Sequence, residues 1–301
     1  MSAHNLLTER EYYLGFSVFT GIGPVRFKLL KNHFGNAKAI WNSSRAELSN
    51  IKLGNKLTFQ YLEFRNKFSI GNFKKTLQKQ KINYLIPTDE LYPALLKEIA
   101  DPPLVLYIKG NPERLLKMNF MIAIIGTRKM TDYGRLVASK ITADLVFNNV
   151  TIVSGMALGI DSVAHRTALE YNGLTVAVLG SGIDVIYPFS NSGLYKDIIE
   201  KNGLVVSEYP PGQRATKTSF PARNRIISGM SRAVVVVEGA LGSGSLITAS
   251  YAADQGREVF AVPGPVTSRT SAAAAYLLKN GAALAQNAQD IIRELKQSNT
   301  S

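Results

Sequence analysis

The sequence has no cysteine at all and only three histidines among its 301 residues. Without cysteine there can be no disulfide and no thiolate metal site. His4, His33 and His165 are too scattered in sequence to suggest a cluster of metal ligands. We therefore expect neither a metal nor any other cofactor.

Apolar runs of membrane-spanning length are also missing. A transmembrane helix needs roughly 18 consecutive apolar residues, and no segment approaches that length. The start, from Met1 to Asn5, lacks a basic region followed by an apolar run and a small-residue cleavage site, so we expect no secretory signal. Together these absences predict a cytoplasmic protein with no membrane partner.

Acidic residues are scarce relative to basic ones, with 22 Asp and Glu against 35 Lys and Arg, a net charge of +13 and a pI near 9.8. Such a surface attracts polyanions, although many basic proteins bind none. One segment concentrates the charge, because the stretch from 208 to 232 holds five basic residues against one acid. The five are Arg214, Lys217, Arg223, Arg225 and Arg232. This cluster favours nucleic acid as the polyanion.

The chain divides into two predicted domains, the first of which covers residues 1–84. Apolar residues such as Leu14, Val18 and Val25 recur there at helical spacing, which predicts a small all-helical domain. The turn Gly21-Ile22-Gly23-Pro24 resembles a helix-hairpin-helix, in which backbone N–H groups approach DNA phosphates. A tight turn within a packing module fits the same residues, and the two interpretations stay open.

Residues 85–301 are predicted to form a second, larger α/β domain. Continuous Val- and Ile-rich runs alternate there with helical stretches, which is typical of a Rossmann-like, doubly wound and mostly parallel sheet buried on both faces. The runs cover residues 121–125, 151–153, 175–179, 204–206, 233–237 and 259–262, with an added strand at 105–108. The four alanines at 272–275 suit the start of a helix.

Four loops that follow these runs combine glycine with small hydroxyl residues, at 126–128, 154–161, 180–184 and 238–245. Ligands of an open parallel sheet bind at the carboxyl ends of its strands, where such loops present N–H groups to anions. The expected phosphate contacts are Gly126, Thr127, Ser154, Gly155, Gly180, Ser181, Gly182, Gly244 and Ser245. Tight strand-to-helix turns remain the alternative. Neither the dinucleotide fingerprint nor the Walker motif is present, which argues against NAD and ATP.

The segment from Lys217 to Arg225 places an aromatic ring among basic residues. Basic side chains that meet phosphates beside a ring on which a base can stack are typical of single-strand binding. We therefore expect Phe220 to stack a base and Lys217, Arg223 and Arg225 to contact phosphates. Two alternatives stay open: Phe220 as a buried anchor, and Arg225 in a salt bridge to an acid such as Glu238.

No catalytic residue is assigned. Asp161 stands at a predicted helix start, where an aspartate caps free N–H groups. His165 follows four residues later on the same face, so an Asp–His pair is conceivable. Because no serine or cysteine nucleophile motif accompanies the two, we predict no active site.

These motifs resemble the DprA/Smf family of DNA-processing proteins. The resemblance rests on residues 125–128, 154–165, 179–184 with Tyr187-Pro188, 207–212, 220–225, 244–249 and 256–259 with 261–264. It implies a non-enzymatic protein that protects incoming single-stranded DNA in natural transformation and loads the RecA recombinase, and it implies a homodimer. It gives the strand-binding roles to Arg128, Lys217, Phe220, Arg223 and Arg225. Many members continue into a winged-helix domain, which we expect to be absent here.

The main alternative is an enzyme of the LOG type, which cleaves nucleoside monophosphates and shares a Rossmann-like fold; a simple nucleotide-binding protein is a related possibility. Arg223 stands at a comparable distance before the strand at 233–237. The following loop, 238–245, has no glutamate where that group keeps its catalytic acid, and cleavage of the glycosidic bond needs such a proton donor. We therefore expect a binding protein.

Overall fold

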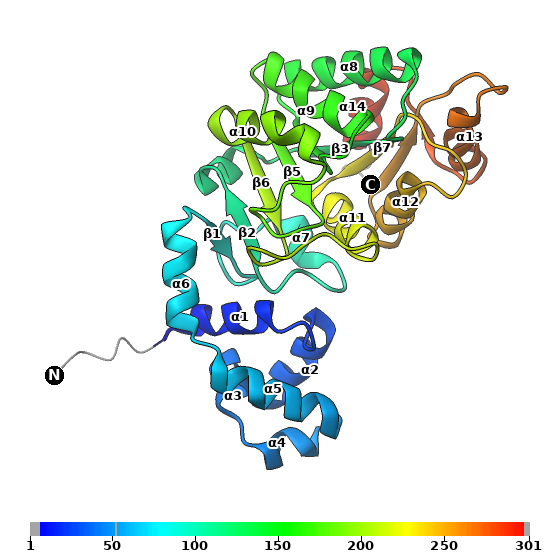
Figure 1. The fold of residues 1–301 in the computed structure, drawn as a ribbon. Coiled ribbons are helices and arrows are strands. Elements are labelled where there is room, and N and C mark those ends of the chain that lie inside the picture. The colour runs from blue at the N-terminus through cyan, green and yellow to red at the C-terminus, as the bar shows by residue number, and fades with distance from the viewer. Residues whose placement is uncertain (1–6, 52, 298–301) are drawn as a thin grey trace.

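The computed structural model describes residues 7–51 and 53–297, and it confirms an all-helical region followed by an α/β region (Figure 1). The predicted position His4 lies outside the described residues. The helices of the first region are α1 (Glu9–Val18), α2 (Pro24–Phe34), α3 (Ala37–Asn42), α4 (Arg45–Asn50), α5 (Asn55–Lys67) and α6 (Ile70–Lys79). Among the helices of the described residues, none combines the length and the apolar character that crossing a membrane requires.

Local sequence signals explain where these helices begin. Thr8 and Glu11 form a capping box at α1, and Ser44 and Glu47 form another at α4. Pro24 occupies the first turn of α2, directly after the predicted glycine turn. Aromatic rings fill the centre of the region: Phe16 meets the Trp41 ring edge-on at a centroid distance of 5.4 Å.

The α/β region contains a nine-stranded sheet in the order β1-β2-β6-β5-β4-β3-β7-β8-β9. The strands are β1 (Asn83–Leu85), β2 (Leu106–Lys109), β3 (Met121–Ile125), β4 (Thr151–Ser154), β5 (Thr175–Leu179), β6 (Gly203–Ser207), β7 (Ala233–Val236), β8 (Glu258–Ala261) and β9 (Ala283–Leu284). All neighbours pair in parallel except β1 with β2 and β2 with β6. The predicted Rossmann-like sheet is thus confirmed, and its first strand begins at Asn83.

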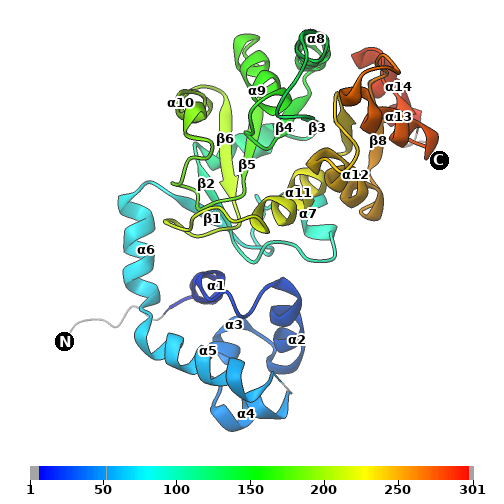
Figure 2. The same ribbon diagram turned by 45° about the vertical axis from the view of Figure 1, so that its right-hand side comes forward.

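Helices cover both faces of the sheet, which is why its central strands are buried along their whole length (Figures 1 and 2). Helices α8 (Asp132–Phe147), α9 (Ile160–Glu170), α10 (Ser192–Glu200) and α14 (Ala288–Gln297) lie on one face. Helices α7 (Ala94–Glu98), α11 (Ser219–Met230) and α12 (Gly244–Asp254) lie on the other. Helix α13 (Ala272–Lys279) begins at the predicted alanine run and packs on β8.

The chain changes direction between β3 and β7, which lie side by side although they are far apart in sequence. Helix α8 follows β3 onto one face, and α12 follows β7 onto the other. The loops after these two strands therefore diverge and leave space at the carboxyl edge, which is where open α/β sheets bind ligands.

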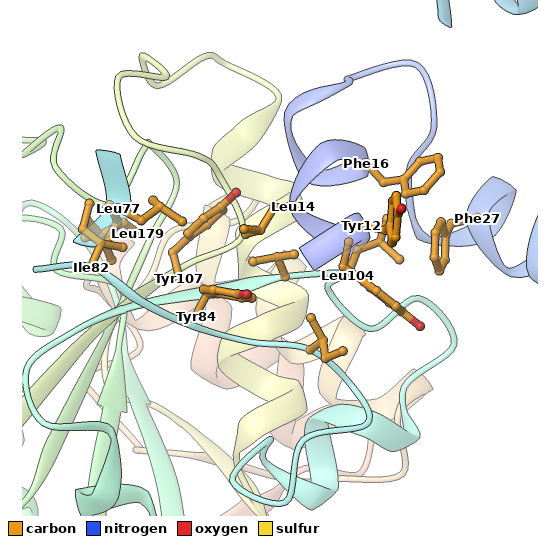
Figure 3. Packing of buried hydrophobic residues seen from close by; sticks show 14 of the residues in the cluster. Tyr12, Leu14, Phe16, Phe27, Leu77, Ile82, Tyr84, Leu104, Tyr107 and Leu179 are labelled. Atoms are coloured by element: carbon orange, nitrogen blue, oxygen red, sulfur yellow. The ribbon is translucent and has the colours of Figure 1, made fainter. Parts of the chain in front are cut away.

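One hydrophobic cluster joins the helical region to the sheet (Figure 3). Leu14 of α1 and Leu77 of α6 share this cluster with Tyr107 of β2 and Leu179 of β5. The Ser17 hydroxyl lies 2.5 Å from the Tyr107 hydroxyl, and the Arg10 guanidinium pairs with Asp89 at 2.9 Å. The two predicted domains thus share a common core.

Candidate nucleic-acid interface

A groove of about 590 Å³ opens at the carboxyl edge, where the loops that follow β3 and β7 diverge. Its walls come from the loop after β3, the first turns of α11 and the start of α12. The predicted site residues that it brings together are Gly126, Thr127, Arg128, Lys217, Phe220, Arg223, Gly244 and Ser245. Segments more than 100 residues apart in sequence thus meet at one site.

The Phe220 ring is partly exposed and stands among other groups of the site. The Arg128 guanidinium carbon lies 5.4 Å from the ring centroid, a cation–π distance. Tyr187 is 49% exposed, and its ring centroid lies 5.2 Å from that of Phe220. Gly180 lies against one edge of Phe220, since a Cβ there would stand 2.9 Å from a ring carbon. Phe220 is therefore anchored on one side and open on the other.

Beside this ring is a small pocket of about 50 Å³. It is lined by Arg128, Gly155, Ala157, Leu158, Tyr187, Pro188, Phe220 and Arg223. In the sequence, Tyr187 stands out only as part of the motif Tyr187-Pro188, which assigns it no role. An aromatic residue shortly after a glycine–hydroxyl loop at the carboxyl edge is the signal that identifies it.

Arg223 lies beneath the groove and is only 5% exposed. Its Nη1 donates to the Gly155 carbonyl at 2.6 Å and also to the Val178 carbonyl, while its Nε donates to Asn224 Oδ1 at 3.2 Å. Burial lowers the pKa of Arg223 to about 10, although the nearby Asp161 carboxylate opposes that change. The guanidinium stays charged at neutral pH, and it braces loops from below the site.

Arg225 requires a correction, because its side chain is 6% exposed and lies outside the groove lining. Its Nη1 and Nη2 donate to the Glu208 carboxylate at 2.8 and 2.6 Å, and its Nε donates to Asp101 at 2.9 Å. Burial would lower the pKa of Arg225, but the Glu208 charge and hydrogen bonds outweigh it and raise that pKa. The salt-bridge alternative applies, with Glu208 and Asp101 as partners instead of Glu238.

Three other residues that we predicted as phosphate contacts, Ser154, Ser181 and Gly182, instead pack against or hydrogen-bond to backbone within the protein. The Ser154 hydroxyl donates to the Ile124 carbonyl at 2.6 Å, and the Ser181 hydroxyl donates to the Val185 carbonyl at 2.6 Å. Gly182 packs so closely that a Cβ would stand 2.5 Å from the Pro210 oxygen. All three residues are buried and line neither the groove nor the small pocket, so we assign them no phosphate contact.

Asp161 and His165 do not form a pair. Asp161 accepts hydrogen bonds from the N–H groups of Gly155 and Ala157 at 3.1 and 3.3 Å, so it holds the β4–α9 loop, while Gly159 is the N-cap of α9. His165 Nδ1 lies 2.7 Å from the Thr175 hydroxyl. Burial, with a smaller effect of Arg223, lowers the pKa of His165 to about 3, so the ring is neutral.

Positive potential in the groove comes from exposed cations and from a helix end. Arg128 and Lys217 are exposed at its rim. The 11-residue helix α12 begins there, and the side chain of its N-cap Ser243 accepts from no backbone N–H of the helix but lies 2.6 Å from the Ser245 hydroxyl. Free N–H groups and the positive end of the helix dipole favour an anion at this point. The groove can thus hold phosphate beside an exposed ring.

A doubly wound sheet with such a groove at its switch point is the arrangement of Rossmann-like proteins that bind phosphate-bearing ligands. The family model of DNA recombination-mediator protein A matches residues 83–296. The chain belongs to this family.

Relatives with established names agree in sequence. Protein Smf of Synechocystis is 38% identical over 291 residues, which cover 96% of this chain and 73% of that protein. DNA processing protein DprA of Streptococcus pneumoniae is 42% identical over 229 residues, covering 76% of this chain and 80% of the relative. Protein Smf of Escherichia coli is 42% identical over 72% of this chain, which spans 58% of that relative.

Solved structures agree in fold. The X-ray structure of DprA from Streptococcus pneumoniae has a TM-score of 0.81 and 35% identity, covering 96% of this chain and 98% of that one. DprA from Helicobacter pylori, solved to explain its single-stranded-DNA binding mode, has a TM-score of 0.63 and 32% identity over 72% of this chain and 97% of its own. The predicted DprA/Smf resemblance and fold are therefore confirmed.

Proposed function

We propose that this protein binds single-stranded DNA in the groove, and that it does so to protect incoming DNA and to load the RecA recombinase during natural transformation. The observation that carries the binding step is the partly exposed Phe220 ring, which borders a groove of about 590 Å³ with cationic rims. The likeness to the Helicobacter pylori protein supports single-stranded DNA as the ligand.

The geometry suggests which group meets which part of the strand. Arg128, Lys217 and the first N–H groups of α12 take phosphates, while Phe220 stacks a base next to Tyr187. Stacking accepts any base, and phosphate contacts carry no sequence information. Binding should therefore show little sequence preference and should weaken steeply as salt rises.

Fluorescence anisotropy with a labelled oligonucleotide tests this proposal. Phe220→Ala should weaken binding by about 1–3 kcal/mol, because the variant loses one stacking platform. The matched control is Phe147→Ala, which removes an exposed phenylalanine at the far end of α8, and it should bind like the wild type. If the two variants bind equally well, or if salt has no effect, the groove is not the DNA site.

An enzymatic role as a nucleoside-monophosphate hydrolase has less support. Among the described residues that line the groove, Asp161 is the one carboxylate, and it is buried and held in place by the N–H groups of Gly155 and Ala157. Glu238 is also buried, and it accepts hydrogen bonds from Thr131 N at 2.9 Å and Thr131 Oγ1 at 2.6 Å. Neither acid is free to donate a proton to a leaving base. Incubation with AMP should release no adenine, and steady release would favour the enzyme.

Recombinase loading and homodimer formation belong to the same proposal and are supported by membership of the family. Loading can be measured as faster RecA filament growth on strands coated with single-strand-binding protein. Light scattering after size-exclusion chromatography gives the mass of the assembly. A monomer that does not accelerate filament growth would limit the proposal to strand binding.

A further inference from the structure

The positive charge of this protein is concentrated away from the groove. Residues 1–84 hold 14 of the 35 Lys and Arg but four of the 22 Asp and Glu, so this region carries +10 of the net +13. The α/β region, which contains the groove, is close to neutral at +3. A polyanion that approaches this protein is therefore attracted mainly to the helical region.

Much of this charge is available to a ligand. Arg10, Lys67 and Lys74 form ion pairs with carboxylates. Within residues 7–51 and 53–297, the exposed basic side chains of the helical region with no carboxylate at salt-bridge distance are Arg26, Lys28, Lys38, Arg45, Lys56, Lys75, Lys79 and Lys81. Unpaired surface cations interact with phosphates without first breaking a salt bridge.

The turn that precedes helix α2 lies against a loop of the α/β region that leads to the groove. The turn that precedes α2 contributes Thr20 and Gly23 to a cavity of about 170 Å³, and Tyr209 and Gln213 of the α/β region line its other side. The chain runs from Gln213 directly through exposed Arg214 to Lys217 at the groove rim. Arg214 and Lys217 thus follow this cavity, which Glu208 also lines, on the way to the groove rim.

The outer face of α2 has the composition of a phosphate-binding surface. Val25 and Leu29 are 61% and 60% exposed on it, and the exposed Arg26 and Lys28 flank this apolar pair, one on each side. Neither phenylalanine of this helix is exposed, because Phe27 is buried and Phe34 is half-buried, and the exposed ring on it is the imidazole of His33. The face can contact a charged backbone and its sugars but offers little for stacking a base.

We infer that helix α2 is a second DNA-contacting surface, which binds the phosphate backbone of the same strand where that strand leaves the groove. The inference rests on the proposed binding of single-stranded DNA, and it assigns a ligand to the helical region. Charge complementarity and the basic path through Arg214 and Lys217 select DNA over a protein partner. The contact adds affinity only for strands long enough to reach α2.

The test compares two oligonucleotide lengths with the double variant Arg26→Ala/Lys28→Ala. With a strand of about 30 nucleotides, loss of two phosphate contacts should weaken binding about tenfold near 0.15 M salt and reduce the salt slope by about 1.4. With a strand of about six nucleotides, which fills only one site of ordinary size, the variant should bind like the wild type. Both side chains are exposed, so the melting temperature should not change.

The matched control is Lys75→Ala/Lys79→Ala, which removes the same charge from α6. This helix stands on the opposite side of α1 from α2 (Figures 1 and 2), and both of its lysines are exposed. The control should lose far less affinity for the long strand. If the two double variants lose the same affinity for the long strand, the effect comes from the overall charge of the helical region and not from a contact at α2, and the inference is wrong.

The outcomes also separate this inference from the proposed function. If Phe220→Ala weakens binding of both strands while Arg26→Ala/Lys28→Ala changes neither, strand binding in the groove holds and the role of α2 fails. If Phe220→Ala has no effect on either strand, the proposed function fails first. If the α2 variant loses an acidic protein partner but keeps its affinity for DNA, the surface serves protein contacts and the inference is wrong.

Discussion

At the residue scale, Arg223 and Arg225 differ in role although they are two positions apart. Both lie on helix α11, where residues two apart point in nearly opposite directions. Arg223 shares a face with Phe220, three residues earlier, and reaches the groove from below. Arg225 points away and binds Glu208 and Asp101. The sequence pattern predicts a helical stretch only at 226–230, which leaves both arginines in a loop where either could contact DNA. In the structure both belong to the helix.

Arg225→Ala should therefore lower stability rather than affinity. The substitution leaves the Glu208 carboxylate partly buried without its partner, which costs about 3 kcal/mol in comparable pairs. Urea unfolding measures this loss. The comparison is Arg128→Ala. Because Arg128 is exposed, this variant should be as stable as the wild type, while the slope of its DNA affinity against salt concentration (log–log) should fall by about 0.7. If Arg225→Ala keeps the stability of the wild type but its DNA affinity depends less steeply on salt, Arg225 contacts phosphate after all.

His165 should make the protein sensitive to acid. Its pKa is about 3 in the folded state, mainly because of burial, against about 6.5 when unfolded. The unfolded chain therefore binds the proton more readily, so this contribution to stability is present above pH 6.5 and is lost as the pH falls towards 3.

The measurement is the free energy of unfolding between pH 6.5 and 4 for the wild type and for His165→Gln. Protonation of carboxylates lowers the free energy of unfolding equally in both proteins as the pH falls. The difference between their two slopes of unfolding free energy against pH therefore reports the histidine alone. The wild type should be steeper by up to about 1.4 kcal/mol per pH unit, which corresponds to one proton. Parallel curves would show that the ring is protonated in the folded state.

At the element scale, the β4–α9 loop is shaped by charged groups beneath it. Asp161 accepts from two loop N–H groups, and Arg223 donates to the Gly155 carbonyl. The loop glycine is needed because a Cβ at Gly155 would stand 2.6 Å from the Arg223 guanidinium. The loop is therefore held from inside the protein, and its outer side forms part of the small pocket beside Phe220.

Asp161→Ala should loosen this loop. Two N–H groups would lose their acceptor, at a cost of about 1–3 kcal/mol for each buried group left unpaired. Hydrogen exchange at Gly155 and Ala157 should quicken, and global stability should fall in denaturant. Asp161→Asn keeps an oxygen acceptor and should lose less stability. Unchanged exchange in the alanine variant would mean that Arg223 alone holds the loop.

At the scale of the whole molecule, the helical region and the sheet share one hydrophobic cluster, and they should unfold together. Leu14 lies fully buried at this junction with Tyr107 of β2 (Figure 3). Leu14→Ala should cost about 2–5 kcal/mol, as in other buried leucine truncations. Val25→Ala in the same region is the control, because its side chain is exposed and its loss should change stability little.

Scanning calorimetry follows both variants. The wild type and Leu14→Ala should each show a single transition, with that of the variant at lower temperature, because unfolding of either region exposes the apolar side chains that the two regions bury together. Two separate transitions in the wild type would contradict this, and they would mean that the junction adds little to either region.

The sequence by itself determined the strands of the parallel sheet, because runs such as 233–237 are apolar over their whole length and only a doubly covered sheet buries them. It also identified Lys217 and Phe220, because a ring among cations is a local pattern, while the role of Arg128, which the groove brings beside them, came from the family resemblance. A resemblance to known proteins pointed to the same residues.

Only the tertiary structure decided which polar residues reach a ligand. Ser154, Ser181 and Arg225 have the composition of phosphate contacts, yet their partners lie at Ile124, Val185 and Glu208. A donor's partner depends on which distant segments fold beside it, and sequence spacing carries no record of that. For the same reason the common core of the two regions, and the path from the groove to α2, became visible only in three dimensions.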